Sequence, residues 1–397
     1  MLFSNIFIRS LGSFIVLFFV INNFDYTEIT LFNIFIVTIS SFMMFDFGFG
    51  TTFSRLITYS ISMNEQQDKK VKDQYLRSHL IYIDLFYLLK LMKKIYLVLA
   101  IIFFIIITFV GTFLMFDQIN SSINPSKTWF TWFVIVCSTP LLLYLNQFRS
   151  ATEGLHLVAK KNRIEAILMF ISFFLQIMFL IRGLGLTFII VCYLFSLISA
   201  GLINWYLVMS HPKVIKAEKK TNYPTHLLKK IFLLSYKSGV GTFIQLAFQY
   251  GLTIFIGNTY EAKNSSVILT IFRFLNGVSR LSGAFFYAKI PLLNHYFMIK
   301  DYKAFKKITI NNIFLSQFFF LVGSAIVIFY LFNYTFIPVD VGIYFISVLM
   351  LAFFIERLGA LMIQAYTSTN NIIWYKANGL LVLSSLLFLI LFKDNYG

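Results

Sequence analysis

One long apolar run most limits what this chain can become: residues 95–116 read IYLVLAIIFFIIITFVGTFLMF and contain no charged side chain. A helix needs about 20 mainly apolar residues to cross a hydrocarbon core of about 30 Å. The strands of a membrane β-barrel would alternate apolar and polar residues, which this run does not. The whole chain is 59% hydrophobic and 12% charged, against about 25% charged in soluble domains. The sequence therefore predicts an all-α polytopic membrane protein.

Similar stretches recur along the chain and predict about 11 transmembrane helices. Most of the 33 Lys and Arg residues fall in alternate loops between these stretches. Because cytoplasmic loops carry the excess of basic residues, we expect a cytoplasmic N-terminus and a multi-pass protein of the bacterial inner membrane. The expected spans are residues 6–21, 31–61, 95–116, 128–157, 164–182, 186–209, 231–257, 265–292, 308–332, 341–366 and 372–392.

A polar segment rich in Lys and Pro divides the spans into six and five. It is residues 211–230, which we interpret as a cytoplasmic linker between an N-terminal six-helix bundle, 1–210, and a C-terminal bundle, 231–397. SLGSFIVLF near the start resembles SGVGTFIQLA just after the linker, and MFDFGFG resembles IFRFLNG at nearly the same offset. Such similarity predicts parallel repeats, with a twelfth helix missing. The second part of the polar segment 63–94 mixes Leu, Ile, Phe and Tyr with Lys at helical spacing, which predicts an amphipathic helix on the inner leaflet.

Several charged residues lie inside the expected spans, where a charge costs several kcal/mol unless it faces a partner or a cavity. Arginines in a bundle with few acids would make a central cationic cavity suited to an anionic substrate, phosphate or pyrophosphate above all. For arginines near the ends of spans, the alternative is that the side chain extends to the cytoplasmic surface. An arginine could also pair with a glutamate four residues along the same helix. The candidate substrate-binding residues are Arg55, Arg149, Arg273, Arg280 and Arg357, with Arg55 and Arg149 the snorkelling candidates and Arg149–Glu153 the pair.

Asp46 is the candidate for ion coupling, by H⁺ or Na⁺. A carboxylate that changes protonation or binds a cation as a bundle opens to one side and then the other could couple an ion gradient to transport. The alternative is that Asp46 caps a bend near Gly48. Asn would then serve nearly as well, since Asn and Asp are equally good caps.

The sequence contains no enzymatic motif. There is no Walker A motif for an ATP-driven pump, and DFG at 46–48 lacks the other kinase motifs. The two Cys and five His residues are scattered without metal-ligand spacing. We therefore expect no catalytic residue, metal or cofactor. The positive charge is spread over separate loops, which excludes a nucleic-acid-binding stripe.

Two segments resemble a known family. FDFGFGTTFSRLITY resembles the second-span signature of Wzx-type O-antigen and polysaccharide flippases, and LLLYLNQFRSATEGLHLVAKKNRIEAI resembles their junction of the fourth and fifth spans. These flippases belong to the multidrug/oligosaccharidyl-lipid/polysaccharide (MOP) exporter superfamily. The resemblance implies a MATE-like fold, two bundles around a central cavity, with Asp46 and Arg55 at the second-span positions and Arg273 and Arg280 lining the eighth. The missing twelfth span departs from the family pattern.

The function implied by this resemblance is ion-coupled, alternating-access transport in lipopolysaccharide or capsule biosynthesis. The substrate would be an undecaprenyl-pyrophosphate-linked oligosaccharide, moved from the cytoplasmic to the periplasmic leaflet of the lipid bilayer. A polymerase and a chain-length regulator of the same pathway would be partners. An O-antigen polymerase, which is an enzyme, and a multidrug exporter of the same superfamily are the alternatives.

Overall fold

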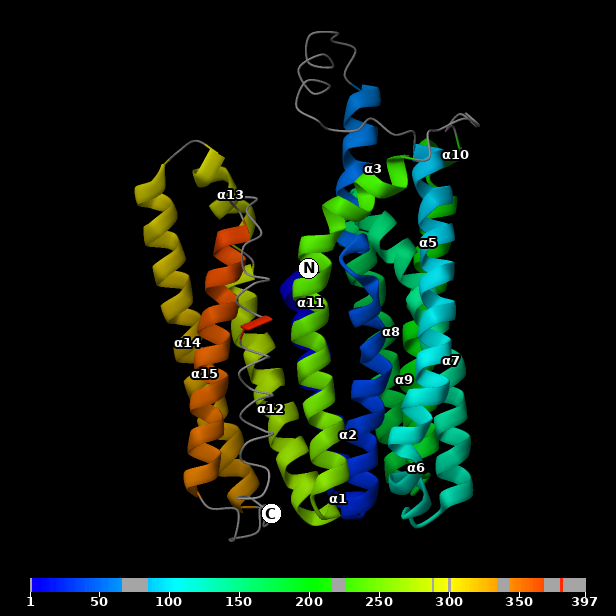
Figure 1. Ribbon diagram of the computed structural model, residues 1–397. Helices are drawn as coiled ribbons and strands as arrows, with labels where there is room; N and C mark the ends of the chain where they lie inside the picture. Colours follow the sequence, from blue (N-terminus) through cyan, green and yellow to red (C-terminus); the bar gives the residue numbers. More distant parts are fainter. Residues whose placement is uncertain are drawn as a thin grey trace.

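The computed structural model describes residues 2–65, 85–215, 226–287, 289–298, 301–333, 343–367 and 379–380, which form helices and short connections without a strand (Figure 1). In the N-terminal half the helices are α1 (Leu2–Asn23), α2 (Tyr26–Ser40), the 3₁₀ helix η1 (Ser41–Asp46), α3 (Phe49–Glu65), α5 (Leu85–Ile106), the π-helical turn η2 (Ile107–Gly111), α6 (Thr112–Asn120), α7 (Pro125–Gly154), α8 (Val158–Ile181), α9 (Leu186–Met209) and α10 (Pro212–Ile215). In the C-terminal half they are α11 (His226–Thr259), α12 (Ala262–Tyr287), α13 (Ile290–Met298), α14 (Tyr302–Asn333) and α15 (Ile343–Thr367).

Eight helical segments of the described chain are long and apolar enough to cross a membrane, so the protein is an all-helical polytopic membrane protein. Two further expected spans correspond to α1, whose apolar part Phe7–Asn23 is shorter, and to α12, which falls outside the eight and contains two arginines. The expected span 372–392 lies almost wholly outside the described residues. The eight segments are Tyr26–Asp46, Leu85–Asn120, Pro125–Gly154, Val158–Ile181, Leu186–Met209, Gly239–Thr259, Tyr302–Phe332 and Ile346–Tyr366.

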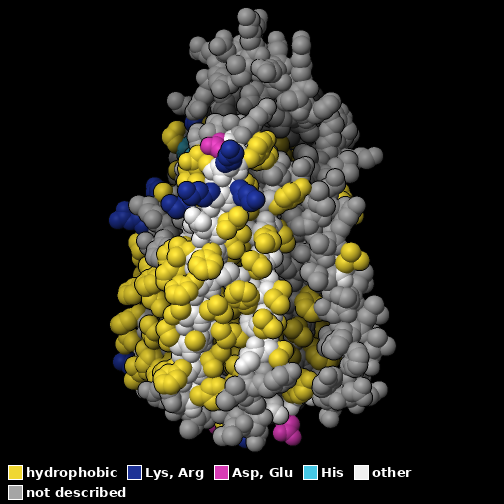
Figure 2. Space-filling model, turned by 90° about the vertical axis from the view of Figure 1, so that its left-hand side faces the viewer, with side chains coloured by type: hydrophobic (Ala, Val, Ile, Leu, Met, Phe, Trp, Pro, Cys, Tyr) yellow, Lys and Arg dark blue, Asp and Glu magenta, His cyan; other side chains and the backbone are white. Residues whose placement is uncertain are grey.

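The outer surface has the polarity that a bilayer requires. Phe113, Phe314 and Phe329 are 81%, 74% and 71% exposed, which in water would leave large apolar patches uncovered. Figure 2 shows hydrophobic side chains spread broadly over one face of the molecule, with Lys and Arg gathered above them. The exposed lysines of the first turns of α14 lie at the same end of the molecule as those of α5 (Figure 1). This basic end is the one we expect to face the cytoplasm.

Two expectations about the first half of the chain were wrong. The span 31–61 is not one helix, because Phe47 and Gly48 have left-handed φ angles of 45° and 70° and separate η1 from α3. The expected surface helix 63–94 does not end at residue 94, because its described part from Leu85 continues into α5. Residues 66–84 lie outside the described residues.

Following the division expected from the sequence, we call α1–α9 the N-terminal bundle and α11–α15 the C-terminal bundle; Figure 1 shows where these helices lie. Within the first, α7 packs on α3, α5 and α9, and α8 packs on α1 and α9; within the second, α14 packs on α12 and α15. The bundles meet where α1 and α2 pack on α12 and where η1 and α3 pack on α11. The interface between the bundles is therefore made by the helices that contain Arg9, Asp46, Arg273 and Arg280.

Close backbone contact joins the bundles at the break between η1 and α3. A Cβ atom added to Gly239 of α11 would lie 2.0 Å from the carbonyl oxygen of Phe47, and Gly48 faces the Gly239 backbone in the same way. Beside this crossing, the Ser235 hydroxyl donates to Thr52 Oγ1 at 2.9 Å. Only glycine fits at position 239 without moving one of the two helices.

At the other end of the interface, side-chain amides form hydrogen bonds between the bundles. Gln118 Nε2 donates to the carbonyl oxygen of Gly257 at 2.6 Å, and Asn258 Nδ2 donates to the carbonyl oxygen of Leu114 at 2.9 Å. Both bonds link α6 to α11. Since α6 and the end of α11 lie at the end opposite the basic turns of α5 and α14 (Figure 1), the bundles are in contact on the side we expect to be periplasmic.

Candidate functional site: an arginine cluster and a helix break

Asp46 is the last residue of the Tyr26–Asp46 span. Twenty residues at a rise of about 1.5 Å each place it about 30 Å from the start of α2, at the end of the span rather than in its middle. One carboxylate oxygen, Oδ2, accepts a hydrogen bond from the backbone N–H of Gly50 at 3.0 Å. This N–H is one of the unpaired donors in the first turn of α3. Asp46 therefore caps the helix that begins after the break, as the alternative interpretation predicted.

The second carboxylate oxygen of Asp46 binds two other helices. The Tyr96 hydroxyl of α5 and the Asn146 side-chain amide of α7 both donate to Oδ1, the latter at 3.0 Å. A carboxylate that accepts three hydrogen bonds is well satisfied, because hydrogen bonds to charged groups contribute about 1.5–3 kcal/mol each. Asp46 thus joins η1 to α3, α5 and α7, and it does so within the N-terminal bundle.

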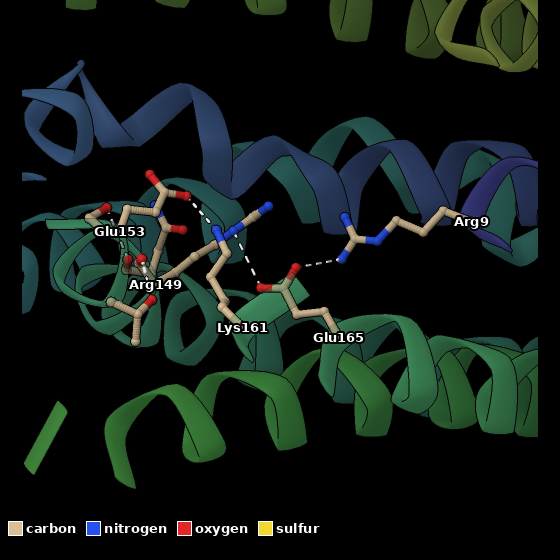
Figure 3. Close-up of polar contacts among 8 residues, drawn as sticks. Arg9, Arg149, Glu153, Lys161 and Glu165 are labelled. Carbon is tan, nitrogen blue, oxygen red and sulfur yellow. Dashed lines mark hydrogen bonds and ion pairs between the residues drawn. The ribbon is translucent and has the colours of Figure 1, made fainter. Parts of the chain in front are cut away.

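A buried carboxylate joins two arginines of the N-terminal bundle. Glu165 of α8 is 5% exposed and lies between Arg9 of α1, at 3.2 Å, and Arg149 of α7, at 3.5 Å (Figure 3). The adjacent pair joins Lys161 to Glu153. The expected pairing of Arg149 with Glu153 along α7 is therefore not observed, because each residue has a closer partner on α8.

The C-terminal bundle adds cations to this group. Arg280 of α12 is exposed, and its charge repels the charges of Arg9 in the other bundle and of Arg273. These side chains come from both bundles. We call the set of Arg9, Arg149, Arg273 and Arg280 the arginine cluster.

Arg273 is the member of the arginine cluster that most directly joins the bundles. Its Nη1 donates to Asn33 Oδ1 of α2 at 3.3 Å, and its guanidinium lies 4.4 Å from the centre of the Phe32 ring. A cation over an aromatic face is attracted by the ring quadrupole. Within the described residues no carboxylate pairs with Arg273. The Asn33 side-chain amide and the Phe32 ring stabilise its charge instead.

Arg357 lies apart from the arginine cluster. It is 4% exposed in the C-terminal bundle, where Nη1 donates to the carbonyl oxygen of Ser279 and, at 2.8 Å, to its hydroxyl, and Nη2 donates to the Ser316 hydroxyl. Its guanidinium is 5.5 Å from the centre of the Phe320 ring. Arg357 thus ties α15 to α12 and α14. The expectation that it lines the same cavity as Arg273 and Arg280 has no support in this geometry.

Arg55 is also separate. It is exposed on α3 and forms no ion pair with the described residues. Of the expected site residues, Arg149 pairs with Glu165 inside the N-terminal bundle, Arg273 contacts Asn33 and Phe32 of α2, and Asp46 lies at the helix break. Sequence reasoning missed Arg9 and Glu165, and also the Asp46 partners Tyr96 and Asn146. An acid inside an apolar run, as Glu165 is, was the available signal for the ion pairs.

The described residues contain no group of three His, Cys, Asp or Glu side chains that could hold a metal ion. No protein-family model, no curated protein and no solved structure matches the chain.

Proposed function

We propose that the protein is a flippase that moves a polyprenyl-pyrophosphate-linked oligosaccharide, of the O-antigen or capsular type, from the cytoplasmic to the periplasmic leaflet of the inner membrane. The observation that carries this proposal is the arginine cluster at the interface of two bundles of membrane-crossing helices. Of its four guanidinium groups, those of Arg9 and Arg149 share one carboxylate, Glu165, and no carboxylate of the described residues pairs with Arg273 or Arg280. A net positive charge within a membrane protein favours an anionic substrate.

The chemistry of arginine favours a phosphate or pyrophosphate group within that class. A guanidinium donates two parallel hydrogen bonds to a phosphate and keeps its charge when partly buried. Arg280 is exposed, so its donors are accessible, and Arg9 and Arg149 are each about one-third exposed. A pyrophosphate would compete with Glu165 for these two arginines. Exchange of one anion for the other gives a reversible way to bind and release the substrate.

Asp46 supplies a place for ion coupling in this proposal. It sits at a break between two helices that contacts α11 of the other bundle, so relative movement of the bundles would change its surroundings. Loss of the Tyr96 hydrogen bond would leave one acceptor position of Oδ1, still bonded to Asn146, open to a proton or Na⁺. Binding of the coupling ion at Asp46 would then depend on the relative position of the two bundles.

The experiment uses purified protein in phospholipid vesicles that contain a polyprenyl-pyrophosphate-linked disaccharide with a fluorophore on the sugar. Dithionite added outside destroys only the fluorophores of the outer leaflet. With the wild-type protein, we expect the inner-leaflet fraction to become accessible, and we expect Arg280→Ala to slow this. Arg182→Ala, at an exposed loop position, is the matched control. An inner-leaflet fraction that stays protected, as in protein-free vesicles, would overturn the proposal, and a lengthened glycan would indicate a polymerase instead.

A further inference from the structure

A groove of about 480 Å³ lies between α5 and α11, at the break that precedes α3. One wall belongs to the N-terminal bundle and the other to the C-terminal bundle. Its apolar lining includes Phe47, Phe49, Val98, Leu99, Phe232 and Val240. Val98 and Phe232 are about half exposed, so the groove opens on the outer surface of the helices, which faces hydrocarbon when the protein lies in a bilayer.

Aromatic rings and close backbone packing shape the groove. The Phe49 and Phe232 rings approach across it with centroids 6.3 Å apart, and the Phe47 ring stacks on Phe243 at 5.2 Å. The Gly48–Gly239 crossing brings the two walls together at one side. The volume is within the usual range for one small ligand, about 300–1,000 Å³, and suits part of a single hydrocarbon chain.

A cationic rim lies directly above this apolar lining. Lys94 lines the groove one helical turn from Val98, and Lys90 lies one turn further along the same face of α5. Both lysines, and Lys93 beside them, are exposed. No carboxylate is among the described residues that line the groove. A ligand with an apolar chain and an anionic head would match this arrangement, because each lysine near the membrane surface attracts an anionic lipid by about 1 kcal/mol.

We propose that this groove is where the pyrophosphate-linked lipid first binds, with its prenyl chain in the groove and its pyrophosphate near Lys94 before it reaches the arginine cluster, an inference that rests on the proposed flippase function. The choice of the substrate over a bulk phospholipid follows from the position of the groove. Its walls belong to the two bundles that would move during transport, and Phe47 is the residue next to Asp46. Occupation of the groove would therefore act on the same helix break that Tyr96 and Asn146 hold through Asp46.

Photolabelling tests this site directly. The full-length protein in phosphatidylcholine vesicles is irradiated with geranylgeranyl pyrophosphate that carries a diazirine at its far end, and labelled peptides are identified by mass spectrometry. We expect label within residues 94–99 and 232–240, and we expect excess unlabelled geranylgeranyl pyrophosphate to remove it. Equal labelling of these peptides by a diazirine-bearing phosphatidylglycerol would overturn the proposal, because it would identify a site for bulk lipid.

Two pairs of variants sharpen the test. Val98→Trp fills the groove and should reduce labelling about tenfold, whereas Leu97→Trp, at a neighbouring residue of equal exposure outside the groove, should leave it unchanged. Lys94→Gln should reduce labelling about fivefold, the equivalent of ~1 kcal/mol, and Lys303→Gln, at an exposed position on α14 outside the groove, should not. Unchanged labelling of correctly inserted Val98→Trp protein would also overturn the proposal.

The vesicle assay with the fluorescent disaccharide separates this inference from the proposed function. Labelling of the groove without any movement of the fluorescent lipid would reject the flippase and leave a prenyl-lipid site. Normal movement by Val98→Trp protein would reject the groove as part of the substrate site and leave the flippase.

Discussion

Arg9 and Glu165 form an ion pair across 156 residues of sequence, with 3.2 Å between Nη2 and Oε2. Since Glu165 is buried, loss of its cations would leave an uncompensated buried charge, which costs about 3–5 kcal/mol. We expect the double variant Arg9→Ala/Arg149→Ala to unfold at a markedly lower temperature in detergent. Adding Glu165→Gln should restore much of the loss, because the neutral amide needs no counterion.

This rescue distinguishes an ion-pair role from simple packing. If the arginines mattered only through their aliphatic stems, the triple variant would be no more stable than the double variant. Arg163→Ala, at an exposed position on the same helix as Glu165, is the control and should leave the melting temperature unchanged.

The second prediction concerns Asp46→Asn. The amide keeps one acceptor for Tyr96 and Asn146, but its NH₂ group would face the Gly50 N–H, which then loses its acceptor. We expect a loss of about 1–3 kcal/mol of stability together with loss of gradient-driven flipping. Asp25→Asn, exposed before α2 and without a side-chain capping bond, should change neither.

Tyr96→Phe separates the two roles of Asp46, because it removes one hydrogen bond and keeps the carboxylate. Retained flipping in Tyr96→Phe with loss in Asp46→Asn would assign the coupling to the carboxylate itself. Wild-type long-chain glycan display by Asp46→Asn in a flippase-deleted host would remove Asp46 from the mechanism and leave it as a cap.

The third prediction contrasts Arg280 with Arg357. Arg280 is exposed and belongs to the arginine cluster, whereas Arg357 is a buried link between helices. Arg280→Ala should weaken binding of geranylgeranyl pyrophosphate with little change in melting temperature, and Arg280→Lys should restore binding only partly. Arg357→Ala should lower the melting temperature, since Ser279 and Ser316 lose their partner. If Arg280→Ala lowered the melting temperature and Arg357→Ala weakened binding instead, the two roles would have to be exchanged.

The fourth prediction compares two glycines of α11. Gly239→Ala places a Cβ atom 2.0 Å from the Phe47 carbonyl oxygen, so the bundles must separate there, and we expect a loss of more than about 2 kcal/mol. Gly251→Ala meets no atom within 4 Å and should stabilise the helix by up to about 1 kcal/mol. Thermal unfolding of both variants measures the difference. A neutral Gly239→Ala would show that the crossing is looser than described.

The fifth prediction concerns orientation in the membrane. Alkaline phosphatase fused after Lys213, near the basic end of the molecule, should be inactive because it stays in the cytoplasm, and a fusion after Ser121 should be active. Activity at the first position and not at the second would invert the expected topology.

The apolar runs predicted the long helices because length and hydrophobicity alone decide whether a segment can cross a bilayer. The same runs hid the break at Phe47, since a Phe-rich sequence with two glycines reads as a helix interior, although the pairing of Asp46 with Gly48 had suggested a cap. The partners of Arg149 and Arg357 could not be predicted. They come from other helices, and the spacing along one helix says nothing about what an adjacent helix presents.

The Asp46 contacts have a consequence for synthesis. The helix break is complete only when Tyr96, 50 residues later, and Asn146, 100 residues later, have joined it. At 5–20 residues per second, the ribosome supplies the last of these partners about 5–20 s after Asp46. Until then a carboxylate near the membrane surface has only the Gly50 N–H beside it, so the α2–α3 segment must wait at the translocon or lie with Asp46 in the headgroup region. The packing of the N-terminal bundle around Asp46 is therefore completed late, when α7 is inserted.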